Sequence, residues 1–142
     1  MQTTPRCQKA LDYANESRTR FGHSQVSSAH LVLGLLTLRG GVGDNVLRKF
    51  GFSVEGVEAY LSSQRSQAEQ ATIQDGLAFG CSAVSALERA QVEARARQHT
   101  YLGVEHLLLG ILAEEHGAAA DLFASVHADR DSMRRIITEE IQ

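Results

Sequence analysis

Two stretches of this chain are hydrophobic at nearly every position, and they are copies of each other. The first covers residues 28–36 and the second covers residues 104–112. Such a run is typical of a buried helix, because it leaves no polar side to face water and is far shorter than the ~20 residues of a membrane span. The copies keep a constant separation of 76 residues (from position 30 to position 106), with these matched pairs: His30 and His106, Leu31 and Leu107, Leu33 and Leu109, Gly34 and Gly110, Leu36 and Leu112.

Apolar positions at helical spacing predict further helices around each stretch. In the first half, one helix begins at Pro5 with Thr4 as its N-cap and ends at Gly22. The glycine-rich segment 39–43 predicts a break, and two short helices follow between residues 46 and 61. The second half repeats this plan: Ala86, Leu87 and Ala90 match Ala10, Leu11 and Ala14; Leu122, Phe123 and Val126 match Val46, Leu47 and Phe50; Met133, Ile136 and Ile137 match Val57, Tyr60 and Leu61.

The pattern therefore predicts an all-α fold of two tandem four-helix repeats. Repeat one covers residues 4–61, a polar linker covers 62–79, and repeat two covers 80–141. Each repeat alone is small for an independent hydrophobic core. We therefore expect a single eight-helix domain over residues 1–142, with pseudo-twofold symmetry and the two apolar helices near its centre. A glycine inside each of these helices costs ~1 kcal/mol relative to alanine, which indicates that another helix approaches closely there.

Composition and charge narrow the range of functions. The 142 residues carry a net charge of −3, which does not suit a nucleic-acid partner, because phosphate binding needs a basic surface. No segment has the pattern of a membrane span, a basic amphipathic membrane helix or a signal peptide. We therefore expect a cytoplasmic protein that binds neither nucleic acid nor membrane. Cys7 and Cys81 lack metal-ligand spacing and are predicted to be reduced thiols, buried or half-buried.

Histidine and serine are the residues that invite a catalytic or metal-binding interpretation. The four histidines related by the repeat are His23, His30, His99 and His106. A zinc site would need their rings to converge within ~2 Å of one ion. Ser27 lies near His30, but a serine at a helix start is first of all a cap, and the sequence places no third group of a triad. We expect histidines that bond to backbone near helix ends, and no catalytic residue, metal ion or cofactor.

Several motifs together resemble a known family. In the first half they are residues 4–6 with 10–11, then 22–23, 29–36 and 46–47; in the second half they are residues 99–112 and 117–122. The chain resembles the N-terminal double-repeat (Clp-N) domain of the Clp-type AAA+ unfoldases, and the ClpC and ClpA members most. The resemblance implies a helical pseudo-dimer that sits on the ATPase ring and binds adaptors and substrates without catalysing a reaction. No lysine of an ATP-binding loop is present in the matched motifs.

The resemblance leads to two functional hypotheses. In the first, the chain is a protein-binding module that recruits or regulates substrates and adaptors for a Clp-type unfoldase-protease. In the alternative, it is a structural accessory subunit that docks on the Clp protease assembly without binding substrate. Its expected partners are Clp unfoldase or protease components, adaptor proteins or client proteins. The chain is either a free-standing protein of this type or a domain of a larger unfoldase.

The resemblance also implies a candidate site for peptides or phosphoarginine. In ClpC-type members, each repeat supplies a glutamate ahead of the repeated histidine and a threonine at the start of its first helix. A carboxylate pairs with the guanidinium, while the hydroxyl and the helix N-terminal amides hold the phosphate. Repeat one keeps Thr4 but has Ala29 in place of the glutamate, whereas repeat two keeps Glu105 but has Gly80 in place of the threonine. Each site is thus expected to be half built, and Glu105 has the alternative role of an acid stabilised at a helix start.

Overall fold

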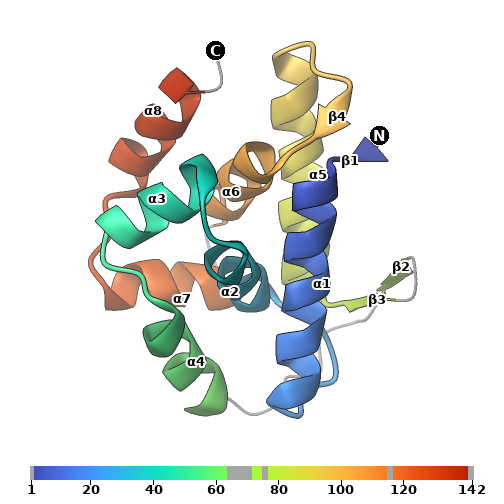
Figure 1. The fold of residues 1–142 in the computed structure, drawn as a ribbon, viewed down its shortest axis with the longest axis vertical. Helices are drawn as coiled ribbons and strands as arrows, with labels where there is room; N and C mark the ends of the chain where they lie inside the picture. Colours follow the sequence, from blue (N-terminus) through green and yellow to red (C-terminus); the bar gives the residue numbers. More distant parts are fainter. Residues whose placement is uncertain (1, 64–71, 75–76, 115–116, 141–142) are drawn as a thin grey trace.

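The computed structural model describes residues 2–63, 72–74, 77–114 and 117–140. Within these residues the chain forms eight α-helices and four short β-strands (Figure 1). The helices are α1 (Pro5–Arg20), α2 (Ser28–Leu38), α3 (Gly41–Lys49), α4 (Val54–Ser63), α5 (Cys81–Ala96), α6 (Val104–Leu112), α7 (Ala118–Ser125) and α8 (Arg130–Glu140). The strands are β1 (Gln2–Thr3), β2 (Thr72–Gln74), β3 (Leu77–Phe79) and β4 (Tyr101–Leu102). The predicted all-α fold is confirmed.

The two apolar helices α2 and α6 are buried, as predicted, and Figure 1 shows α2 end-on in the middle of the molecule. Each packs most closely against the long helix that precedes it, α1 or α5. A Cβ atom at Gly34 would lie 2.3 Å from the carbonyl oxygen of Ala10, and one at Gly110 would lie 2.2 Å from that of Ala86. The close helix approach predicted from these glycines is therefore present in both copies.

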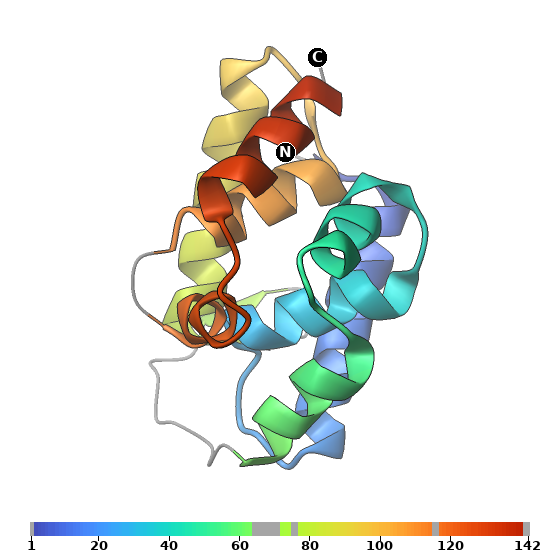
Figure 2. The ribbon, with the colours of Figure 1, turned by 90° about the vertical axis from the view of Figure 1, so that its left-hand side faces the viewer.

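The two halves of the chain interlock through helices of both. Contacts of α1 with α6 are matched by contacts of α5 with α2, and contacts of α2 with α7 are matched by contacts of α6 with α3. Figure 2 shows α7 end-on next to the beginning of α2. At the other end, β1 pairs with β4 in parallel, so that Gln2 lies opposite Tyr101 and Thr3 opposite Leu102. The beginnings of α1 and α6, which belong to different repeats, are thereby held beside each other.

The predicted break at residues 39–43 is shorter than expected, because α3 already begins at Gly41. The glycines do not prevent the helix from starting early, because contacts of Asp44 hold this turn. Asp44 accepts a hydrogen bond from the backbone N–H of Gly40 (3.0 Å) and pairs with Arg48 one turn later (2.6 Å). These contacts tie the turn before α3 to the first two turns of the helix, while the N-cap residue Gly40 offers no side-chain cap.

The stretch predicted as a linker is more structured than expected where it is described. Residues 62–63 belong to α4, and β2 pairs with β3 in an antiparallel hairpin; residues 64–71 and 75–76 lie outside the described residues. Phe79 is buried and bridges to Val26, which holds the end of this stretch against the first repeat. Among the described residues, no helix has both the length and the apolar character needed to cross a membrane.

Candidate functional site

A pocket lies where α1 and α6 begin, at the junction made by β1 and β4. Its volume is about 320 Å³. It combines the first turns of two helices, and helix N-termini favour anions because their backbone N–H groups lack partners inside the helix. The residues that line it are Thr4, Pro5, Arg6, Tyr101, Gly103, Val104 and Glu105.

Thr4 is the N-cap of α1, as the sequence predicted. Its Oγ1 accepts a hydrogen bond from the backbone N–H of Cys7 (3.1 Å), and its own N–H donates to the carbonyl of Leu102 (2.9 Å). The second bond ties the start of α1 to β4 in the other repeat. Because the hydroxyl acts as acceptor toward Cys7, its hydrogen can still donate to a group in the pocket.

Glu105 is the one residue of α6 that is not buried. It lies in the first turn of α6, where the helix dipole attracts an acidic side chain. A Cβ atom at Gly103 would lie 3.1 Å from Oε2 of Glu105, so the glycine leaves the room that this carboxylate occupies. Burial, together with the nearby Glu105 charge, raises the pKa of the Cys7 thiol from 9.0 to about 12. Cys7 therefore lies close to the pocket as a neutral thiol.

The ring of Tyr101 forms another part of the wall. Tyr101 is 44% exposed and stacks on His99, with ring centroids 5.2 Å apart. His99 Nδ1 lies 2.8 Å from His106 Nε2, and His106 Nδ1 accepts from the backbone N–H of Gly103 (2.9 Å). Since Nδ1 of His106 is an acceptor, its Nε2 carries the hydrogen and donates to His99. These bonds hold the turn before Glu105, and the ring contacts of Tyr101 with His99 and His106 place the tyrosine beside it.

Arg6 brings a positive charge to the rim of the pocket. Its Nη2 donates to the carbonyls of Arg39 and Gly40 (3.0 Å each), at the end of α2. An arginine has five N–H donors, so these two contacts leave other donors for a ligand. The pocket thus offers one carboxylate, one guanidinium and two helix N-termini, a combination suited to a ligand that carries both charges.

The structure corrects the expected pairing of Thr4 and Glu105. They were assigned to two separate half-built sites, each contained in one repeat, but they line the same pocket. The other two positions, Ala29 and Gly80, belong to the equivalent junction between α2 and α5. Ala29 is fully buried, and the N–H of Gly80 donates to Val26 (2.8 Å). The threonine and glutamate are therefore both retained at one junction and both absent from the other.

A buried polar network next to Ala29 was missed from the sequence. The Ser28 hydroxyl donates to Oε2 of Glu114 (3.1 Å) and accepts from the N–H of Ala119 (3.0 Å), while Ala120 N–H donates to the same Oε2 (2.9 Å). Burial raises the pKa of Glu114, although these hydrogen bonds act against the shift. The network joins the starts of α2 and α7. The signal for it in the sequence is an acidic residue two positions after the end of the apolar helix α6.

The four repeated histidines form two separate hydrogen-bonded pairs, one in each repeat. The predicted bonds to backbone near helix ends are confirmed for His30, which accepts from Ser27 N–H (2.8 Å), and for His106, which accepts from Gly103 N–H. The rings of His23 and His99 contact these two histidines. Within the part of the chain that the structure describes, no group of three or more candidate ligands is arranged to hold a metal ion. Cys7 is buried as expected, but Cys81 is exposed because it begins α5, so that part of the prediction was wrong.

Comparison with known proteins agrees with this architecture. A family model described as "Clp repeat (R) N-terminal domain" matches residues 2–125 and again residues 78–142. The chain belongs to this Clp N-terminal domain family. The resemblance inferred from the repeated motifs is thereby confirmed.

Individual relatives of this Clp N-terminal domain include a Staphylococcus saprophyticus ATP-dependent Clp protease ATP-binding subunit ClpC, 33% identical over 87% of this chain, and a rice chloroplastic chaperone protein ClpC3, 34% identical over 92%. The chain spans 15% and 14% of the lengths of these two relatives. Among solved structures, the N-terminal domain of ClpD from Arabidopsis thaliana matches with a TM-score of 0.77 at 21% identity, over 99% of this chain and 94% of that one. The Hsp104 N-terminal domain from Candida albicans matches with a TM-score of 0.78 at 17% identity, over 98% and 91%.

Proposed function

We propose that this Clp N-terminal domain is a non-catalytic module that recruits client or adaptor proteins to a Clp-type unfoldase in the cytoplasm. We propose further that the pocket containing Thr4 and Glu105 binds a phosphoarginine side chain of the client. One observation carries this proposal: two residues that are 101 positions apart, each expected from the family resemblance, line one pocket at the start of two helices.

The chemistry of the pocket supports such a ligand. The Glu105 carboxylate matches a guanidinium group, and charge-assisted pairs of this kind are roughly twice as strong as neutral hydrogen bonds. The Thr4 hydroxyl, the first turn of α1 and the spare donors of Arg6 match a phosphoryl group. The exposed ring of Tyr101 offers a face on which the flat guanidinium can stack. The pocket on its own selects for a ligand that has a cation and an anion close together.

Isothermal titration with free phosphoarginine tests the pocket directly. We expect one binding event per chain, and Glu105→Ala should weaken it at least tenfold, or about 1.4 kcal/mol, because a charge-assisted contact is lost. Glu55→Ala is the matched control, since Glu55 is an exposed acid near the start of α4. Free arginine and inorganic phosphate are the control ligands. Absence of binding at millimolar ligand, or binding indifferent to Glu105→Ala, removes the phosphoarginine proposal.

Capture from the native host tests the recruiting role. The immobilised chain should retain unfolded clients or adaptor proteins, and Glu105→Ala should release the clients that carry phosphoarginine. Recovery of the Clp proteolytic core alone, with no client or adaptor, would instead support the accessory-subunit hypothesis.

A further inference from the structure

The outward face of α1 carries a row of charged and aromatic side chains. Arg6, Lys9, Tyr13, Glu16 and Arg20 follow one another at spacings of three and four residues, which places them on one side of the helix. The four charged members are exposed and the tyrosine is half-buried. We name these five residues the α1 stripe. It has three cations against one carboxylate.

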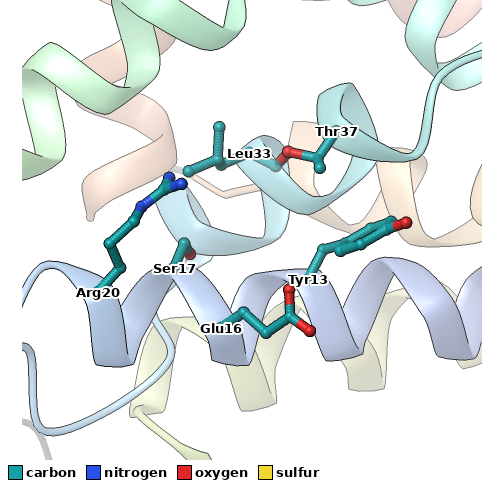
Figure 3. Close-up of a pocket in the computed structure, with 6 residues that line it drawn as sticks. All are labelled: Tyr13, Glu16, Ser17, Arg20, Leu33 and Thr37. Carbon is teal, nitrogen blue, oxygen red and sulfur yellow. The ribbon is translucent and has the colours of Figure 1, made fainter.

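The α1 stripe connects two hollows. Arg6 lines the proposed phosphoarginine pocket at the beginning of α1. At the other end, a hollow of about 180 Å³ lies between α1 and α2, lined by Tyr13, Glu16, Ser17, Arg20, Leu33 and Thr37. Figure 3 shows Arg20 extending from α1 toward Leu33 on α2, with Thr37 farther along the same helix. This second hollow therefore presents hydroxyl groups, the Arg20 guanidinium and the Glu16 carboxylate beside the aliphatic side chain of Leu33.

The cations of the stripe are not all neutralised by neighbours. Arg20 forms an ion pair with Glu58 of α4, and Lys9 lies over the ring of Tyr13 at 5.9 Å. In the contacts described above, Arg6 donates only to backbone carbonyls, and these neutral groups do not cancel its positive charge. The exposed side chain of Arg39, which follows α2, adds a further positive charge near Arg6.

The second repeat does not share this character. The positions equivalent to the stripe, on α5, are Ser82, Ser85, Arg89, Val92 and Ala96. Only one of them is charged, and Val92 is 61% exposed. Since α1 and α5 have the same length and the same packing role, the fold does not require cations on this face. The cations are found in the repeat whose first helix also contributes Thr4 to the pocket.

We propose that the α1 stripe binds an acidic, extended segment that flanks the anchored residue of the client. This inference rests on the proposed function, because the anchor occupies the pocket at Thr4 and Glu105. From Pro5 to Glu16 the helix rises about 17 Å, at 1.5 Å per residue. An extended peptide covers this distance in about five residues at ~3.3 Å each. An acidic side chain about five positions from the anchor thus reaches the hollow beside Arg20.

Fluorescence anisotropy with labelled peptides of about twelve residues tests this register. Each peptide carries one phosphoarginine and differs only in its flanks: glutamate four to six positions away on one side or the other, glutamine at the same positions, or lysine. At about 0.05 M salt we expect one glutamate-flanked peptide to bind about three- to tenfold more tightly than the glutamine peptide, and the lysine peptide to bind more weakly. The advantage should disappear at about 0.5 M salt, because the contacts are exposed.

Protein variants locate the effect on the stripe. Lys9→Gln should remove most of the glutamate advantage while leaving the affinity for free phosphoarginine unchanged. Arg89→Gln is the matched control, because Arg89 is the exposed cation at the equivalent face of α5. An advantage that survives Lys9→Gln and falls with Arg89→Gln overturns the proposal.

The remaining outcomes separate this inference from the proposed function. If glutamate and glutamine peptides bind equally, the stripe proposal fails while phosphoarginine recognition stands. If no phosphoarginine peptide binds, the proposed function fails. The stripe proposal then stands only if a glutamate-rich peptide without phosphoarginine binds and Lys9→Gln weakens that binding; otherwise it fails too. Tighter binding of an oligothymidine than of the acidic peptide, lost in Lys9→Gln, would overturn the choice of an acidic peptide as the occupant.

Discussion

Mild acidification should destabilise this domain, because a histidine is held neutral in its core. His30 is 2% exposed, its Nδ1 accepts from Ser27 N–H, and its Nε2 lies 2.8 Å from His23 Nδ1. Burial, aided by the neighbouring His23 and Arg18, lowers the pKa of His30 from 6.5 to about 3. The unfolded chain therefore binds a proton at this residue below pH 6.5, whereas the folded chain does so only near pH 3. Stability from this group is fully present above pH 6.5 and is lost as the pH falls toward 3.

The magnitude follows from the distance to the unfolded pKa. About pH 5 is roughly 1.5 units below that value, and each unit corresponds to about 1.36 kcal/mol, so His30 should cost about 2 kcal/mol there. Burial also lowers the pKa of His106, which adds a loss in the same direction. Glu114 changes the stability in the opposite direction on acidification. Burial raises its pKa, so the folded chain binds this proton at a higher pH than the unfolded chain does. The contribution of His30 is therefore best measured as a difference between two proteins.

Urea unfolding followed by circular dichroism at about pH 8 and about pH 5 provides the assay. The free energy of unfolding should fall by about 2 kcal/mol more in the wild type than in His30→Gln, which corresponds to a shift of the urea midpoint by roughly 1 M. His127→Gln serves as the control, since His127 is exposed, and its pH response should equal that of the wild type. An equal pH response in the wild type and in His30→Gln would show that His30 is not held neutral by the fold.

Three further predictions follow from the packing. Gly110→Ala should lose about 1–2 kcal/mol of stability, because overlap of the new Cβ with the Ala86 carbonyl outweighs the ~1 kcal/mol gain in helix propensity; a rise in the thermal midpoint would contradict this close approach. Native protein should react with a thiol reagent at Cys81 only, and at Cys7 only in denaturant; fast labelling of both thiols would disagree with the burial of Cys7. Glu114→Ala should cost about 1–3 kcal/mol, since its hydrogen-bond donors lose their acceptor, whereas Glu114→Gln should cost less than about 1 kcal/mol; equal losses in urea unfolding would argue against a buried acceptor role.

The candidate site was only half predictable. The residues Thr4 and Glu105 were found by comparing the copies of a repeat with a family motif, since each position has a clear sequence context. The sequence did not show that they share one pocket. Comparing the two repeats assigns each residue to a site within its own repeat, where the other residues are close in the chain. The pocket forms across the repeats, and the contact that aligns it is a pairing of only two residues on each of β1 and β4. So short a pairing leaves no periodic pattern to recognise.

The helices, the duplication and the burial of α2 and α6 can all be predicted from the amino-acid sequence. These features follow from local periodicity and from a match that repeats at a constant separation. The glycine in each copy also indicates the close approach of a second helix. The folded structure is needed to show which helix beginnings meet, which of the two equivalent junctions keeps Thr4 with Glu105, and where Ser28 joins Glu114. The physical reason is that a helical pattern specifies which face is buried but not which partner covers it. That choice is made by the interlocking of the two repeats.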